Sequence, residues 1–367
     1  MTHDKDNMRL IAVGDIMLGR GIATSPFAQF DALLSPELKR VMQGDIITGN
    51  LECLLGEKGN PNPNSHSHFR GDTGRATPLL QRFDVLSLAN NHINDFGSEA
   101  ISETQSYLNE IGVAHVGVGL DEEEAVKPAL LERGGHRVAI FAATTVSPLP
   151  ASGPYKAAAP NEFLFRKIRE QKEKGAICIL HLHTGGGDFS NPAPFVRELM
   201  QEVAQTGVDI VLGHHPHIVQ GRQSIAQSQI FYSLGDFIFD KFENGRDSSL
   251  VVQADFNPAG EVRQIQAVPV IRTDTLVVEP IGGKELDKFN ARLRGLDEMI
   301  ADGSSDGAFQ KEFGNPVKRI LEGIVKDARA GGLPALWAKV KRIDRRRLSL
   351  IFGPFIGVFR PGKGRQP

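Results

Sequence analysis

Short apolar runs alternate with amphipathic segments along the first 212 residues, and this order constrains the fold more than any other feature of the chain. Apolar runs of roughly four to eight residues indicate buried strands, and glycines end most of the helical segments between them. The predicted strands are 9–13, 84–89, 137–143, 176–181 and 209–212, and the predicted helices begin at Ser35-Pro36 or cover 99–111, 161–174 and 194–205. This alternation predicts an α/β fold.

After residue 212 the pattern changes to consecutive strand candidates with turns and no helices between them. These candidates are 229–232, 249–256, 261–270 and 275–278. Alternation followed by consecutive strands predicts a sandwich of two sheets rather than one doubly wound sheet. We also expect the polar segment 57–75, rich in Gly, Pro and Asn, to be a long functional or mobile loop.

Helical spacing returns near the C-terminus, and we therefore place a domain boundary near residue 282. The predicted helices there are 285–301, 308–329 and 334–347, with 302–307 as a Gly/Ser-rich loop. The predicted division is a domain of 8–282, a helical extension of 283–347 and a basic, apolar tail of 348–367.

Composition excludes several classes of protein. A formal net charge of −2 argues against a chain that binds nucleic acid through overall positive charge. The polar N-terminus lacks a signal-peptide core, and no stretch reaches the roughly 20 apolar residues of a spanning helix. Cys53 and Cys178 are too few for a disulfide framework, which fits a reducing compartment. We expect a cytoplasmic protein, at most peripheral to the inner face of the membrane.

The C-terminal 30 residues carry nine Lys or Arg and one acidic residue, and they include the apolar stretch Leu348–Phe359. Basic residues beside Phe, Ile and Leu could contact an anionic membrane surface or an acidic polymer. Packing of this stretch onto the core of the protein is the interpretation we favour, because twelve residues cannot span a bilayer.

Five segments place metal-binding side chains at the ends of predicted strands. They are Gly14-Asp15, Asn50-Leu51-Glu52, Asn90-Asn91-His92, His181-Leu182-His183 and Gly213-His214-His215-Pro216-His217. Carboxyl ends of strands in an α/β fold face one edge of the sheet, so these side chains can converge. Carboxylates, imidazoles and an amide oxygen suit divalent Mn, Fe or Zn, and one carboxylate can bridge two ions.

Each segment alone has an ordinary explanation. A Gly-Asp pair is most often a turn or helix cap, and His92 alone would be a loop histidine with hydrogen-bond partners. However, six of the eleven histidines fall in three of these short segments. Because a buried histidine needs hydrogen-bond partners, such crowding is hard to explain by packing and favours a metal site.

Five motifs in order carry a resemblance to a known family. They are GDIMLGR (14–20), NLECLLG (50–56), SLANNHINDFG (87–97), VLGHHPHIVQG (211–221) and YSLGDFIFD (232–240). The chain resembles the CapA family of bacterial capsule or poly-γ-glutamate biosynthesis proteins, which are related to calcineurin-like metallophosphoesterases. The resemblance covers roughly residues 8–280 and implies a four-layer α/β/β/α sandwich. The helical extension and the tail lie outside it.

The resemblance implies roles for individual residues. Asp15 resembles the ligand of the first ion, Glu52 the bridging carboxylate and Asn91 the amide ligand of the second ion. His92 resembles the histidine that contacts the leaving group or acts as general acid. His183 resembles the next ligand of the second ion, and His181 competes for that role.

In the same way, His215 and His217 resemble the H-x-H pair that completes the site, one for each ion. His214 is either a substitute ligand or lies behind the ligands. Arg20 and Arg70 are candidates for gripping a phosphate or carboxylate group, with a loop salt bridge as the alternative for Arg70.

The chain departs from the metallophosphoesterase pattern at two informative positions. Met17 stands where a histidine usually follows the first aspartate, so the first ion is either held weakly or completed by another group. Asp236 stands where an asparagine is usual, and its carboxylate is either an extra ligand or a partner for a ligating histidine.

These features predict a metal-dependent hydrolase, with two divalent ions, that uses metal-activated water on a phosphoester or on an amide bond of a glutamate-rich or cell-envelope polymer. The expected partner is therefore an anionic polymer, a peptide or a phosphoester. The alternatives are a non-hydrolytic accessory or binding component of a polymer synthase, and a metal-assisted peptide epimerase. The substrate and the oligomeric state stay open.

Overall fold

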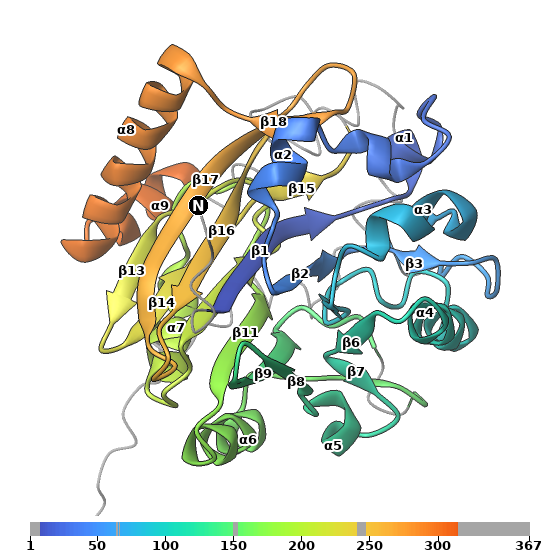
Figure 1. Ribbon diagram of the computed structural model, residues 1–367, viewed down its shortest axis with the longest axis horizontal. Helices are drawn as coiled ribbons and strands as arrows, with labels where there is room; N and C mark the ends of the chain where they lie inside the picture. Colours follow the sequence, from blue (N-terminus) through green and yellow to red (C-terminus); the bar gives the residue numbers. More distant parts are fainter. Residues whose placement is uncertain (1–7, 64, 66, 150–152, 241–246, 315–367) are drawn as a thin grey trace, which may run out of the picture. The chain divides into compact units, whose positions relative to one another are not determined.

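A computed structural model describes residues 8–63, 65, 67–149, 153–240 and 247–314. Two mixed sheets form the centre of the part described (Figure 1). The first sheet has the order β18-β17-β16-β1-β2-β5-β6, with β15 also paired to β1. Its strands are β18 (Val278–Pro280), β17 (Val262–Arg272), β16 (Ser248–Phe256), β1 (Met8–Ile16), β2 (Ile46–Leu51), β5 (Val85–Ser87), β6 (Ala114–Val116) and β15 (Asp236–Ile238).

The second sheet has the order β13-β14-β12-β11-β9-β8. Its strands are β13 (Arg222–Ile225), β14 (Ser228–Phe231), β12 (Ile210–His214), β11 (Ile177–His183), β9 (His136–Thr144) and β8 (Ala129–Arg133). The central strands β9, β11, β12 and β14 are parallel, as are β1, β2, β5 and β6 of the first sheet. Two small ladders pair β3 (Leu54–Leu55) with β4 (Arg70–Gly71) and β7 (Val118–Gly119) with β10 (Lys156–Ala157).

Alternating side chains of β1 divide the interior into two cores. Leu10 and Ala12 pack against strands of the second sheet, whereas Ile11 and Val13 pack against helices on the opposite face. This is the two-residue period of a strand that is buried on both faces. The helices on that face are α2 (Pro36–Val41), α3 (Thr73–Leu80) and α4 (Ser98–Glu110), with the 3-10 turn η1 (Phe30–Leu33) beside them.

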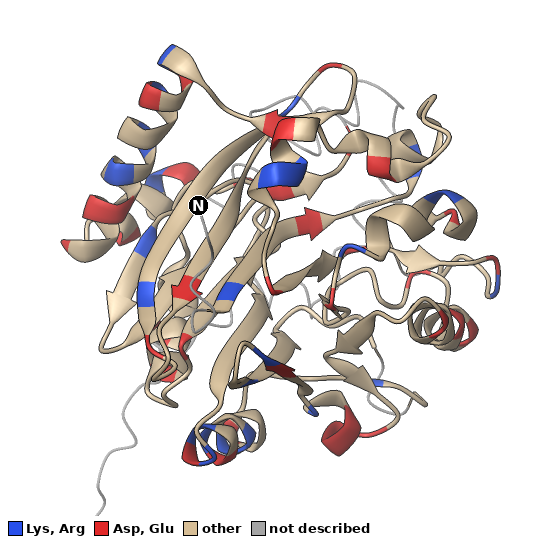
Figure 2. Ribbon diagram, in the orientation of Figure 1, with Lys and Arg blue, Asp and Glu red and all other residues tan. Residues whose placement is uncertain are grey.

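Two helices form the outermost layer beyond the second sheet. They are α6 (Glu162–Glu173) and α7 (Pro194–Ala204), which bury one apolar face each. The order helices, sheet, sheet, helices confirms the predicted α/β/β/α sandwich. Short helices α1 (Arg20–Ala23) and α5 (Glu122–Ala125) lie in connections. Charged residues gather on outer helices such as α5 and α6, which fits a solvated outer surface (Figure 2).

Helix α8 (Gly283–Ala301) belongs to the same compact unit as the two sheets, a unit that extends to Phe309. Leu293, Leu296 and Ile300 are its buried residues. Helix α9 (Ser305–Phe313) begins inside the predicted loop 302–307, so that loop is shorter than expected. Gln310–Pro367 form the second unit, and the predicted helix 334–347, most of 308–329 and the basic tail lie outside the described residues.

Most predicted elements agree with the structure within a few residues, and the clearest error is the last strand. The sequence pattern predicts an extended segment at 275–278, but Leu276 donates its backbone N–H to Thr273 in a turn and has a φ of 69°. The strand β18 therefore starts only at Val278. The polar loop 57–75 also contains β4 and the first turn of α3, because the side chain of Asp72 caps that helix. Within the described residues, no helix is both long and apolar enough to cross a lipid bilayer.

Candidate metal centre

The carboxyl ends of strands from both sheets meet at one place in the molecule. Asp15 lies in β1, Glu52 directly follows β2, and His183 and His214 are the last residues of β11 and β12. These strands therefore run slightly further than predicted, and Asp15, His183 and His214 lie within them rather than after them. Parallel strands of each sheet bring these side chains to a common edge, as the sequence pattern indicates.

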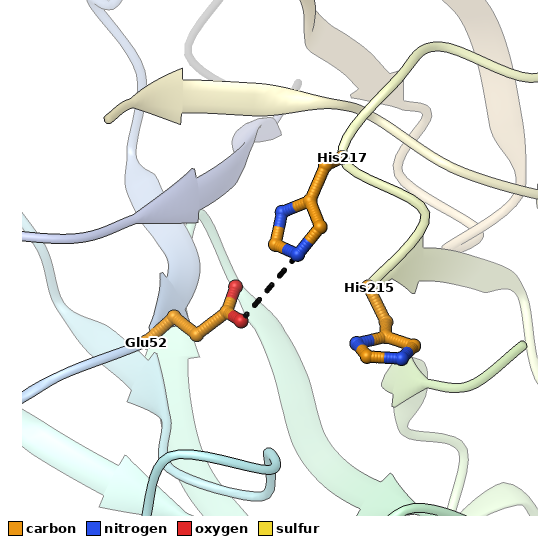
Figure 3. Close-up of side chains that lie close together, drawn as sticks. All are labelled: Glu52, His215 and His217. Carbon is orange, nitrogen blue, oxygen red and sulfur yellow. Dashed lines mark ion pairs between the residues drawn. The ribbon is translucent and has the colours of Figure 1, made fainter. Parts of the chain in front are cut away.

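Glu52 lies at the centre of this cluster. Its side chain is fully buried, and neither carboxylate oxygen has a hydrogen-bond partner among the described residues. Ligand-type atoms of Glu52, His215 and His217 lie within 4.8 Å of one another (Figure 3). The same holds for those of Glu52, Asp15 and His183. Burial, followed by the nearby charge of Asp15, raises the pKa of Glu52 well above its usual value.

Asp15 is held by two donors on one of its oxygens. Asn50 Nδ2 donates to Asp15 Oδ1 over 2.9 Å, and His214 Nδ1 lies 2.8 Å from the same oxygen. Burial opposes ionisation of this carboxyl group, but attraction to His214, His183 and His217 outweighs burial and holds its pKa below the usual value. Asp15 is therefore a buried carboxylate with its second oxygen, Oδ2, directed to the rest of the cluster.

His217 is oriented by Asp236. His217 Nδ1 lies 2.8 Å from Asp236 Oδ1, while His217 Nε2 lies 3.9 Å from Glu52 Oε1 (Figure 3). Burial alone would lower the pKa of His217, but the charges of Asp236 and Glu52 outweigh it and raise the pKa to about 10. A carboxylate on Nδ1 is the arrangement that fixes a histidine for metal binding through Nε2. Asp236 Oδ1 is therefore placed as a partner for a ligating histidine. Ligand-type atoms of Asp15, His217 and Asp236 also lie within 4.8 Å of one another, so the role of an extra ligand stays open as well.

His183 and Asn91 converge from the two sheets. His183 Nδ1 lies 3.3 Å from Asn50 Nδ2, and His183 Nε2 lies 2.7 Å from Asn91 Oδ1. Because Nδ1 faces an amide N–H, the ring hydrogen of neutral His183 lies on Nε2 and is donated to Asn91. Burial and the neighbouring His215 lower the pKa of His183 well below its usual value.

The segment that carries His215 and His217 has an unusual backbone. Their φ angles are 94° and 63°, in the left-handed region that residues other than glycine rarely adopt. Such strain costs about 1–3 kcal/mol per residue and is concentrated at functional sites. With this backbone conformation, both imidazoles lie on the side of Glu52 (Figure 3). His215 and Asn91 are the partly exposed members of the cluster, so solvent reaches it from their side.

His92 lies beside the cluster, and each of its two ring nitrogens faces a carboxylate. Its Nδ1 lies 2.8 Å from Asp95 Oδ2, and its Nε2 lies 3.8 Å from Glu52 Oε1. The ring stacks on Phe69, with 3.9 Å between centroids. Asp95 also accepts the backbone N–H of Phe69 over 2.8 Å, so one carboxylate holds both the histidine and the ring beneath it.

The two candidate arginines differ in their surroundings. Arg20 Nε lies 2.8 Å from Asp240 Oδ2, and its guanidinium carbon lies 5.2 Å from the centroid of Phe69. Through Phe69, Arg20 is next to His92. Arg70 instead donates to the carbonyl oxygens of Gly56 and Lys58 and stacks on Phe96. The structure thus brings Arg20 to the site and uses Arg70 to hold its own loop.

His181 and His214 are fully buried and make all their ring-nitrogen contacts with the protein. Neither residue belongs to a group that could hold an ion among the described residues. Burial, followed by the neighbouring His214, lowers the pKa of His181 well below its usual value. Met17 is fully buried, and its Sδ accepts the backbone N–H of Gly19 over 3.1 Å.

The residues that orient the candidate ligands are the ones that sequence reasoning missed. The sequence pattern marks Asn50 only as a neighbour of Glu52, and it does not single out Asp95, Thr48 or Phe69. The spacing of His92 and Asp95, three residues apart, is a signal that could have identified this pair. No local signal marks Thr48, because its partner His181 is 133 positions away in the sequence.

The donor set fits divalent metal ions. Buried carboxylates are normally hydrogen-bonded, closely paired or bound to a cation. Glu52 accepts no hydrogen bond from a described residue, and its ion-pair contacts, with His92 and His217, are long, at 3.8 and 3.9 Å. One oxygen of Asp236, Oδ2, is likewise without a hydrogen-bond partner there. Carboxylate and imidazole groups converging at this spacing are the ligands that Mn, Fe and Zn use in proteins.

Comparison with known proteins gives one family. A family model described as bacterial capsule synthesis protein PGA_cap matches residues 9–241. The capsule biosynthesis protein CapA of Bacillus anthracis is 29% identical over an alignment of 267 positions, which covers 68% of this chain and 64% of that protein. The PGA biosynthesis protein CapA of Bacillus subtilis is 27% identical over 68% of each chain. The match thus spans slightly less than two thirds of the first relative's length.

A probable polyglutamine synthesis accessory protein of Mycobacterium tuberculosis is 27% identical over 53% of this chain and 56% of its own length. Among solved structures, a 5′-nucleotidase precursor from Thermus thermophilus aligns over 81% of this chain and 59% of its own, with 14% identity and a TM-score of 0.41. The NAD nucleotidase of Haemophilus influenzae aligns over 83% and 59%, with 13% identity and a TM-score of 0.40.

Proposed function

Because this chain belongs to the family of bacterial capsule synthesis proteins, we propose that it is a metal-dependent hydrolase of a cell-envelope polymer such as poly-γ-glutamate. The bond cleaved is a phosphoester or an amide. The observation that carries this proposal is Glu52, a fully buried carboxylate with neither oxygen hydrogen-bonded by a described residue, surrounded by Asp15, His183, His215 and His217.

Six residues would hold the ions in this proposal. Asp15 and His217 would serve one position, Asn91, His183 and His215 the other, and Glu52 would serve both. Bound divalent ions supply Lewis acidity, which makes water a nucleophile near neutral pH and stabilises negative charge on the substrate.

The chain's own residues would handle the proton and the substrate charge. Asp95 holds His92 through Nδ1, so that Nε2 points toward Glu52 and can donate a proton to a leaving group. Arg20 lies beside the Phe69–His92 stack and carries the positive charge that would bind a phosphate or carboxylate of the substrate. Phe69 is itself buried and keeps water from the inner face of the His92 ring.

The first test is the metal content of protein purified without chelator. We expect one to two divalent ions per chain in the wild type and their loss in the double variant His215→Ala/His217→Ala. His115→Ala is the control, because His115 lies on β6 and its charged neighbour is Glu124. Equal metal content in the wild type and the double variant would contradict the metal centre.

Turnover is the second test, with phosphoesters and γ-glutamyl amides as substrates. Asp15→Asn, Glu52→Gln and His217→Ala should each reduce turnover by roughly 100-fold or more, while circular dichroism shows an unchanged fold. Turnover that persists in all three variants would refute the hydrolytic mechanism.

An accessory role in polymer synthesis is the second candidate, favoured by the name of the Mycobacterium tuberculosis relative. In that case the metal centre would bind an anionic polymer without cleaving it. Metal-loaded wild type that binds poly-γ-glutamate and hydrolyses neither substrate class would support this candidate over the hydrolase.

A further inference from the structure

A chain of four buried side chains runs between the two sheets behind the candidate ligands. Thr48 Oγ1 lies 2.8 Å from His181 Nε2, and His181 Nδ1 lies 2.9 Å from His214 Nε2. His214 Nδ1 in turn lies 2.8 Å from Asp15 Oδ1. The centroids of the two imidazoles are 5.2 Å apart, with 21° between the ring planes, so the rings are nearly coplanar along their hydrogen bond. All four residues are at most 1% exposed.

The direction of the last hydrogen bond follows from counting donors. An ionised carboxylate can only accept, so Nδ1 of His214 must carry a hydrogen and donate it to Asp15. In a neutral ring, Nε2 of His214 then accepts from Nδ1–H of His181. Nε2 of His181 accepts in turn from the hydroxyl group of Thr48.

The hydroxyl hydrogen of Thr48 has a second acceptor, the carbonyl oxygen of Val85 at 2.9 Å. If the hydroxyl hydrogen points to Val85, Nε2 of His181 carries a hydrogen and donates it to Thr48. A further hydrogen then lies between Nδ1 of His181 and Nε2 of His214, so the two rings together carry one hydrogen more than two neutral imidazoles. Nδ1 of His214 still donates to Asp15 in that arrangement. The role of His214 is therefore the same whichever way the hydroxyl of Thr48 points.

We infer that Thr48, His181 and His214 are positioning residues that hold Asp15 as a ligand with one available oxygen, and that neither histidine binds metal. This inference rests on the proposed function for the metal itself. Its basis is the difference between the two oxygens of Asp15. Oδ1 receives both His214 Nδ1 and Asn50 Nδ2, whereas Oδ2 faces the cluster, where the backbone N–H of His215 donates to it over 3.3 Å.

The positioning matters because Met17 does not help to hold the ion that Asp15 would bind. Its sulfur accepts a backbone N–H of its own turn, and Met17 belongs to a buried apolar cluster. With fewer protein ligands at this position, the orientation of Asp15 has more influence on affinity. Groups that orient a ligand typically change metal affinity about 10–100-fold when removed.

The test compares two substitutions of His214 in the full chain. His214→Asn keeps an N–H donor near the position of Nδ1, and His214→Leu removes it. Titration of metal-stripped protein with Mn²⁺ in a calorimeter should show about tenfold or greater weakening for His214→Leu and less than about threefold for His214→Asn. Equal weakening in both variants, or wild-type affinity in His214→Leu, would overturn the inference.

A second matched pair of variants tests Thr48, which lies at the opposite end of the hydrogen-bonded series from Asp15. This test does not depend on whether His214→Leu folds. Thr48→Val removes the hydroxyl group at nearly constant volume, and Thr48→Ser keeps it. We expect weaker Mn²⁺ binding in Thr48→Val than in Thr48→Ser. The reverse order would contradict a role for Thr48.

Nitrogen NMR of histidine-labelled, metal-free wild type tests the hydrogen positions directly. We expect the hydrogen of His214 on Nδ1, and a ring with its only hydrogen on Nε2 would overturn the inference. This spectrum also distinguishes a failure of the inference about His214 from a failure of the proposed function. A wild type that binds no Mn²⁺ would refute the proposed function, while the spectrum would still decide how Asp15 is held.

Discussion

Glu52 is a buried acid whose surroundings in the metal-free chain are unfavourable. Its two oxygens have no hydrogen-bond partner among the described residues, and Asp15 adds a second negative charge nearby. An unsatisfied buried polar group costs about 1–3 kcal/mol, and a charged group costs more. Metal-free protein is therefore expected to be less stable because of Glu52, a residue that the proposed function requires.

We predict that Glu52→Gln stabilises the metal-free protein by about 1–3 kcal/mol, because the neutral amide is spared the loss of ionisation that burial imposes on Glu52 when the chain folds. Added Mn²⁺ should raise the unfolding temperature of the wild type much more than that of the variant, since binding to the folded state alone is stabilising. Calorimetric unfolding with and without metal measures both effects. The control Glu198→Gln, at an exposed position in the middle of α7, should change neither value. A metal-free Glu52→Gln variant less stable than the wild type would contradict this account.

The stability difference between these two proteins should depend on pH. The pKa of Glu52 is raised in the folded chain, so below the unfolded value, near 4.5, the residue is protonated in both states and imposes no penalty. Above that pH the unfolded chain ionises first, so the penalty in the wild type grows as pH rises. Urea unfolding of metal-free protein at pH 4.5 and pH 7.5 should show the advantage of Glu52→Gln increasing with pH. A constant or shrinking advantage would indicate that Glu52 is ionised in the folded state.

At the scale of elements, an irregularity in β1 aims Asp15 at the second sheet. Ala12 pairs with Thr48 and Asp15 pairs with Asn50, so β1 has one residue more than β2 over this interval. Such a bulge shifts the alternation of side chains. Ala12 and Asp15 both face the second sheet as a result, although a regular strand would place them on opposite faces.

Gly14 lies inside this bulge, where β1 approaches β15 closely. A Cβ atom at Gly14 would lie 2.0 Å from the carbonyl oxygen of Gly235. We predict that Gly14→Ala destabilises the protein by about 1–3 kcal/mol or more and weakens Mn²⁺ binding, because the backbone beside Asp15 must move.

Gly295→Ala is the matched control for Gly14→Ala. Gly295 lies inside α8, and a Cβ atom added there would meet no described atom within 4 Å, so alanine should stabilise by about 0.5–1 kcal/mol and leave metal binding unchanged. Denaturant unfolding measures the first effect and calorimetric titration the second. Equal behaviour of the two variants would show that the approach of β1 to Gly235 is not important.

At the scale of the whole molecule, α8 completes the unit that carries the site. Gly221 lies against Leu296 and Ile300 so closely that a Cβ atom there would be 2.7 Å from the Ile300 side chain. Asp297 accepts from the backbone N–H and the guanidinium group of Arg222, each over 2.6 Å. Because Gly221 and Arg222 follow the His215–His217 segment, α8 supports the strand that leaves the site.

We predict that a chain ending at residue 282 is less stable than one ending at residue 314 by about 3 kcal/mol or more, since burying each leucine or isoleucine contributes about 1.5–3 kcal/mol. Thermal unfolding of the two chains compares them. Equal stability would support the predicted domain boundary near residue 282 as an independent folding limit. Lower stability of the shorter chain would instead make α8 part of the same cooperative unit.

Much of this architecture could be predicted because local sequence controls it. Strands such as β9 and helices such as α6 are encoded by apolar periodicity and end at turn residues, which depend only on neighbouring positions. Glu52, His215 and His217 could be identified for a similar reason, since residues that follow parallel strands lie at a common edge of the sheet.

The orientation of the site depends on contacts that no local pattern contains. Asp15 and His214 are 199 positions apart, and their hydrogen bond requires both sheets to be assembled. The same is true of Thr48 with His181, and of the bulge that turns Asp15 inward. Local periodicity therefore specifies which ligand-type residues reach the edge of each sheet. Packing of one sheet on the other decides which of these residues face the cluster around Glu52 and which only hold neighbouring side chains in place.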